Sequence, residues 1–94
     1  MVTLINRFTV KEGGNEEFEK ILDGLTGYMS AQPGFLGHRL LRSVRNRQVY
    51  VETAEWSDAE SHRNAMGGEE FRSHIQRLGS VATPDPDIFE TVAE

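Results

Sequence analysis

The chain has 94 residues and no cysteine, and its ten basic and fifteen acidic residues leave a formal net charge of −5. The acidic balance argues against a nucleic-acid or anionic-membrane partner, and no segment approaches the roughly 18 apolar residues of a membrane span. The length suits a single domain, which we predict over residues 1–94. No disulfide can form, and the N-terminus shows no basic region followed by an apolar run, so we expect a cytoplasmic protein without a signal peptide.

The first half of the chain predicts a strand, a helix and a hairpin. Residues 2–10 predict a strand because they are rich in β-branched and aromatic side chains. Asn15 is a candidate N-cap for the helix that follows, and Pro33-Gly34 ends that helix. Residues 35–43 and 48–56 predict two further strands, and the segment 44–47 between them is short enough for a hairpin. The apolar residues of the helix recur at helical spacing: Phe18, Ile21, Leu22, Leu25, Tyr28 and Met29.

The second half predicts an interrupted helix and a last strand. Ser57-Asp58-Ala59-Glu60 has the pattern of a capping box, so a helix is predicted to start there and to run to about Met66. Gly67-Gly68 interrupts it, and residues 69–78 predict a second helical piece that Gly79 closes. We expect residues 83–86 to form an extended loop and residues 88–92 to form a short strand.

The order of these elements predicts an α+β fold of the ferredoxin-like type. Strand, helix, two strands, helix and strand make the split βαβ pattern, in which both helical segments cover one face of the sheet. The first strand also places Ile5 on the face that carries no helix. A second copy of the chain would cover that face, so we predict a homodimer in the form of a dimeric α/β barrel.

Two polar residues interrupt otherwise apolar faces. Asn6 interrupts the apolar face of strand 2–10, and His74 interrupts the apolar face of helix 69–78. A buried polar group without a partner costs roughly 1–3 kcal/mol, so each needs an internal partner or a ligand. Taken singly, Asn6 reads as a side chain bonded to nearby backbone and His74 as a satisfied histidine at the edge of the core. Together they predict a cavity with a metal or base ligand on one wall and an amide donor on the other.

The remaining candidates carry less information. His38 reads as a hairpin-strand histidine with no role, and His62 is expected on the solvated surface. The three histidines are too scattered for a zinc site. No nucleophile–base triad, phosphate loop or carboxylate dyad is evident, and Gly13-Gly14 lacks the spacing of a dinucleotide-binding motif.

Three segments resemble the antibiotic biosynthesis monooxygenase superfamily. They are the first strand with its central Asn6, Gln-Pro-Gly-Phe-Leu-Gly at 32–37, and Ala-Glu-Trp-Ser-Asp at 54–58. The similarity covers nearly the whole chain and implies a monooxygenase with a small-molecule substrate. Within the superfamily the chain resembles most the Isd-type heme-degrading monooxygenases, with which it shares its length and Pro-Gly-Phe-Leu-Gly before Leu-Leu-Arg.

The Isd-type resemblance implies heme as both cofactor and substrate, with O₂ and an external reductase as electron donor. The histidine that holds the heme iron in those enzymes matches His74, and their distal asparagine matches Asn6. Those enzymes also carry a tryptophan that distorts the porphyrin, and its place falls here at about Ala65 or Met66. This departure leaves open whether heme is degraded or only bound. Candidate walls of the heme pocket are Leu22, Met66 and Phe71.

Two other interpretations stay open. The chain is also similar, at Trp56, to the cofactor-free polyketide branch, whose members oxidise anthrone-like phenols to quinones with O₂ alone. They often have an asparagine four residues earlier on the same strand face, where this chain has Glu52, a possible base for a phenol. Asn6, Glu52 and Trp56 would then form the substrate site, without a cofactor. The third interpretation is a non-catalytic module that binds heme or another small molecule, since fold alone does not imply function.

Overall fold

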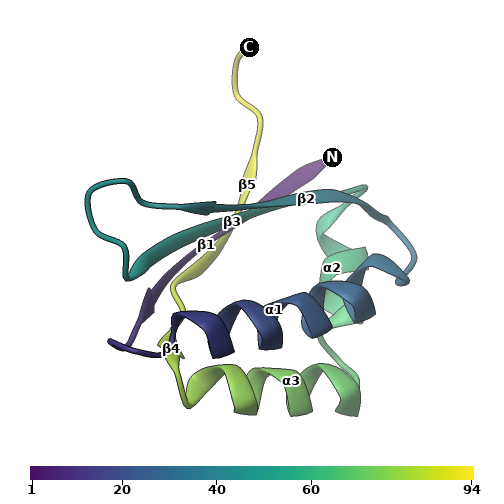
Figure 1. The fold of residues 1–94 in the computed structure, drawn as a ribbon. Coiled ribbons are helices and arrows are strands. Elements are labelled where there is room, and N and C mark those ends of the chain that lie inside the picture. Colours follow the sequence, from purple (N-terminus) through teal and green to yellow (C-terminus); the bar gives the residue numbers. More distant parts are fainter.

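The computed structural model describes all residues, 1–94, and shows one sheet with three helices on one of its faces (Figure 1). The elements in chain order are β1 (Val2–Val10), α1 (Asn15–Ser30), β2 (Phe35–Arg42), β3 (Val49–Trp56), α2 (Ala59–Ala65), α3 (Glu69–Gly79), β4 (Ala82–Thr83) and β5 (Pro86–Glu90). No helix combines the length and the apolar character needed to cross a membrane.

The sheet has the strand order β2-β3-β1-β4, and β5 also pairs with β1. Every pairing is antiparallel, and β1 lies in the middle with β3 on one side and β4 and β5 on the other. The predicted ferredoxin-like α+β fold is therefore confirmed. The last strand differs from the prediction, because Thr83 pairs with Thr9 and the paired part of β5 begins at Pro86 rather than Ile88. Prolines fit there because an edge strand does not need every N–H.

The helix starts follow capping chemistry, with two differences from the sequence-based expectation. Asp58, not Ser57, caps α2: its carboxylate accepts the Ser61 N–H at 2.7 Å, and this bond lowers the pKa of Asp58. Asn15 does not cap α1, where the N-cap is Gly14. The Asn15 amide instead donates to the Arg47 carbonyl oxygen at 2.9 Å and to the Tyr50 hydroxyl at 3.2 Å, so it ties α1 to the hairpin.

The turn between α1 and β2 requires a glycine. Gly34 has a φ of +91°, and a Cβ added there would lie 2.5 Å from the Cβ of Ser61. The same residue accepts the Ser57 N–H at 2.8 Å through its carbonyl oxygen. Gly34 thus holds the start of β2 against the start of α2, which fixes the position of the α2 side chains over the sheet.

The core lies between the sheet and the helices. Because side chains alternate along a strand, every second side chain of β1 and β3 points toward the helices. The apolar stripe of α1 packs against these side chains. The opposite face of the sheet, with Ile5, Leu41, Val51 and Phe89, has no helix over it (Figure 1). The largest fully buried side chains of the core are Phe8, Phe18, Leu22, Tyr50, Trp56 and Leu78.

Candidate active site

A cavity of about 260 Å³ lies between the helix-covered face of the sheet and the helices. Its floor comes from β1 and β3, its walls come from all three helices, and Pro84 and Pro86 close one side. Eleven of its seventeen lining residues are hydrophobic, so it suits a largely apolar ligand. The volume is slightly below the roughly 300–1,000 Å³ that is usual for small-molecule sites.

Glu52 is the one carboxylate that lines this cavity. It lies on β3 between Tyr50 and Ala54, two positions whose side chains are buried in the core, and only 8% of its surface is exposed. Burial disfavours the charged form and raises the pKa of Glu52 to about 7, although the Thr26 hydroxyl, which donates to Oε2 at 3.5 Å, opposes the shift. A carboxyl group that titrates near neutral pH can take and return a proton during catalysis.

Asn6 lies directly across from Glu52 in the register of β1 and β3. Its Oδ1 accepts the Asp85 N–H at 3.0 Å, which orients the amide and leaves the Nδ2 donors for a ligand. Asn6 and Glu52 both line the cavity. The backbone partner expected for Asn6 taken singly is therefore present, and the residue also belongs to a cavity.

Trp56 and His62 form a second polar group in the cavity wall. Trp56 is 1% exposed, and its buried Nε1–H has no hydrogen-bond partner in the protein. The His62 ring meets the indole edge to face at 5.4 Å between ring centroids. The prediction that His62 is solvated is wrong: it is buried on the inner side of α2, and burial lowers its pKa, which keeps the ring neutral at pH 7.

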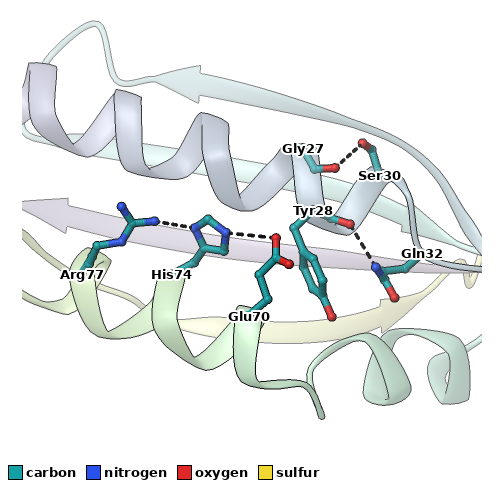
Figure 2. A network of polar contacts seen from close by, with 7 residues as sticks. All are labelled: Gly27, Tyr28, Ser30, Gln32, Glu70, His74 and Arg77. Carbon is teal, nitrogen blue, oxygen red and sulfur yellow. Dashed lines mark hydrogen bonds and ion pairs between the residues drawn. The ribbon is translucent and has the colours of Figure 1, made fainter.

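His74 lies away from this cavity, between α1 and α3 (Figure 2). Its Nδ1 is 2.9 Å from the Arg77 guanidinium, and its Nε2 is 3.7 Å from the Glu70 carboxylate, one helical turn earlier. The ring packs against α1 so closely that a Cβ on Gly24 would lie 3.4 Å from Cε1. The partners of His74 therefore come from its own helix, and the structure does not bring it together with Asn6.

The model of the antibiotic biosynthesis monooxygenase family matches residues 1–77. The chain belongs to this family. The resemblance inferred from the sequence motifs is thereby confirmed at the family level. The buried Glu52 lies within the matched residues.

Two relatives of known activity match most of the chain. Deoxynogalonate monooxygenase from Streptomyces nogalater is 36% identical over 88 residues, which make up 94% of this chain and 74% of the relative. A mycobilin-producing heme oxygenase from Mycobacterium tuberculosis is 31% identical over 83 residues, 87% of this chain and 79% of the relative.

Solved structures agree with the fold. The crystal structure of SnoaB, a cofactor-independent oxygenase from Streptomyces nogalater, superposes with a TM-score of 0.93 at 33% identity and covers 99% of this chain and 94% of its own. A conserved protein from Methanosarcina mazei superposes with a TM-score of 0.87 at 15% identity and covers 95% of this chain and 90% of its own. The latter likeness concerns the fold alone.

The remaining sequence-predicted residues of this monooxygenase fall into two groups. Met66 and Phe71 line the cavity, and Met66 is partly exposed. Leu22 does not line the cavity but is buried in the core on α1. Ala65, the last residue of α2, is buried and likewise does not line the cavity.

Sequence reasoning missed two polar residues of the site, His62 and Thr26, and reached Glu52 only through the family resemblance. A signal for each was present. Glu52 interrupts a buried strand face in the same way as Asn6 does on β1. Thr26 follows Leu22 by one helical turn and so interrupts the apolar face of α1.

The residues of this family member do not fit a heme held by His74. Both ring nitrogens of His74 face side chains of α3, and the ring is packed against α1.

Proposed function

We propose that this protein is a cofactor-independent monooxygenase that oxidises an anthrone-type aromatic phenol to a quinone with O₂. The observation that carries the proposal is Glu52, a buried carboxyl group with a pKa of about 7 in an otherwise apolar cavity. Support also comes from the relatives, since deoxynogalonate monooxygenase and the cofactor-independent oxygenase SnoaB match nearly the whole chain.

The residues suit base-catalysed oxygenation. The Glu52 carboxylate would remove a proton from the activated CH₂ group of the anthrone, and the resulting carbanion would give its electrons to O₂. The peroxide that forms loses water as the carbonyl appears, so CH₂ and O₂ become C=O and H₂O, and the proton held by Glu52 leaves with that water. The substrate supplies all the electrons that reduce O₂, so the reaction needs no other reductant.

Two donors would stabilise the negative charge that develops on oxygen. The unpaired Nε1–H of Trp56 and the Nδ2 group of Asn6 belong to residues that line the same cavity as Glu52. A donor fixed in a water-poor site stabilises an oxyanion more than water does, because it is already oriented when the charge appears. The apolar walls would hold the flat rings of the substrate.

Heme degradation is the competing interpretation, and it rests on the relative from Mycobacterium tuberculosis, a mycobilin-producing heme oxygenase. That reaction would need an external reductase, whereas the oxygenation proposed here needs none. The positions of His74 and Leu22 outside the cavity favour the cofactor-independent reaction. A non-catalytic binding module would leave the raised pKa of Glu52 without a use.

The decisive experiment incubates heme-free, chelator-treated protein with an anthrone and follows both quinone absorbance and O₂ consumption. We expect one O₂ consumed for each quinone formed. Glu52→Gln should lose at least about 100-fold in rate, in line with the loss of a general base. Glu55→Gln is the matched control, because Glu55 lies on the same strand but on the other face of the sheet. Equal rates for the wild type and Glu52→Gln would contradict the proposal.

We also propose that the protein forms a homodimer through the sheet face that carries no helix. Leu41 and Phe89 are 49% and 46% exposed on that face, next to Ile5 and Val51. The same face also carries polar side chains such as Arg7, Arg39 and Asp87, and exposed apolar side chains rimmed by polar residues are typical of an interface. A second copy would bury both sets of side chains at once, since a two-fold interface uses the same patch twice.

A further inference from the structure

We propose that His38 is the proton outlet of Glu52, exchanging the proton of the buried carboxyl group with bulk water while a substrate fills the cavity. The inference rests on the proposed function, because it assigns a route by which a Glu52 that is protonated at neutral pH becomes the carboxylate that removes the substrate proton. His38 is a proton-transfer residue acting through Glu52, and it does not line the substrate cavity.

The geometry places His38 between Glu52 and solvent. His38 lies on β2, the edge strand next to β3, and its Nδ1 is 3.6 Å from Oε2 of Glu52. The Glu52 side chain is 11% exposed and the His38 side chain is 34% exposed. A small side-chain movement would bring the two atoms within hydrogen-bond distance while the far nitrogen of the imidazole stays near water.

A surface depression between α1 and β2, called the outer depression below, supports this route. Thr26 and His38 both line the depression, and Thr26 also lines the substrate cavity. Thr26 donates to the same oxygen of Glu52 that faces His38. Oε2 of Glu52 therefore contacts two residues, Thr26 and His38, that both line the outer depression.

His38 is the titratable group in contact with Glu52. The other polar groups that face Glu52 are Thr26 from α1 and Asn6 from β1, and neither exchanges a proton near neutral pH. His62 from α2 shares the cavity and lies against Trp56. The outer depression also contains charged side chains of α1: Glu16, Glu19, Lys20 and Asp23.

The need for an outlet follows from the titration of Glu52. With a pKa of about 7, a large share of the protein holds a protonated Glu52 at neutral pH. Such a molecule is inactive as a base, and an apolar substrate that fills the cavity separates the carboxyl group from water on that side. A proton path on the other side would let the carboxylate form with the substrate already bound.

The transfer balances without any redox step. The protonated Oε2 of Glu52 gives its proton to the unprotonated Nδ1 of His38, and the Nε2–H of the imidazolium gives a proton to water. Glu52 becomes a carboxylate, and His38 returns to a neutral ring with its remaining proton on Nδ1. Rotation or proton exchange with solvent then resets the tautomer.

The test compares His38→Gln with Arg39→Gln. Arg39 is the next residue on β2, and it pairs with Thr53 on the other face of the sheet, so it is a matched control. We expect His38→Gln to lower kcat for anthrone oxidation by about tenfold at neutral pH with little change in KM, which is the behaviour of impaired proton transfer. Added imidazole should restore the rate of His38→Ala, because the site is open to solvent, but not the rate of Glu52→Gln.

A second measurement does not depend on turnover. In nitrogen-15 spectra of the ligand-free protein, the His38 ring resonances should show an additional inflection at the pH where Glu52 titrates, and Glu52→Gln should remove it. Absence of this inflection, unchanged kcat in His38→Gln, or an equal loss in Arg39→Gln would overturn the proton outlet. Wild-type protein without anthrone oxidation would refute the proposed function, and the spectra would then decide the Glu52–His38 coupling by themselves.

Discussion

The buried carboxyl group of Glu52 should make the stability of the protein fall as pH rises. Its pKa is raised from 4.5 to about 7 in the folded chain, so the folded state binds a proton more tightly than the unfolded state does. Stability therefore decreases with pH wherever the folded state holds the additional proton, which is between the two pKa values. Below this window Glu52 is protonated in both states, and above it the full cost of burying the charge is present.

The size of the effect follows from the two pKa values. The shift from 4.5 to about 7 corresponds to about 3 kcal/mol at high pH, at about 1.4 kcal/mol for each factor of ten. Between about pH 5 and about pH 8 the contribution of Glu52 should change by about 2.5 kcal/mol. Glu52→Gln removes the titration, so the variant should gain about this much stability relative to the wild type over that range.

Urea denaturation followed by circular dichroism at several pH values measures this difference. Glu90→Gln is the control, because Glu90 is exposed on β5. The buried His62 acts in the opposite direction, since its lowered pKa makes stability fall as pH drops below the usual value of 6.5. That contribution is common to wild type and variant, so it cancels in the difference. A difference that stays constant from about pH 5 to about pH 8 would refute the buried, proton-binding carboxyl group.

Three further outcomes are expected. Trp56→Phe should keep the ring packing against Phe35 and lower the anthrone oxidation rate by about tenfold or more, as expected for the loss of an oxyanion donor, and an unchanged steady-state rate would remove the indole N–H from the mechanism. Hemin titration should give no sharp Soret band that depends on His74, and a band lost in His74→Ala would instead support the heme interpretation. Light scattering should give twice the mass of the chain, and Leu41→Asp with Phe89→Asp should give the monomer, because two exposed apolar side chains of the proposed interface become charged. A wild-type monomer at micromolar concentration would contradict the dimer.

The sequence alone determined the order of the elements and the family. Alternation over β1 and β3, helical spacing in α1 and the punctuation at Pro33-Gly34 and Gly67-Gly68 are local signals, because each depends on residues a few positions apart. The ferredoxin-like fold follows from that order, since few topologies satisfy short connections and a sheet covered on one face. The observed element boundaries differ from the predicted ones by a few residues where two neighbouring residues could each be the N-cap, as Ser57 and Asp58 could before α2.

Tertiary structure alone decided which polar residues share a site. Asn6 and His74 both interrupt apolar faces, yet the pairing of β1 with β3 sets Asn6 across from Glu52, whereas the packing of α3 on α1 places His74 outside the cavity. The burial of Glu52, which raises its pKa, depends on side chains from α1, β1 and β2 together. A helical period gives the face on which a residue lies but not the element that this face will meet, because that depends on how distant segments pack.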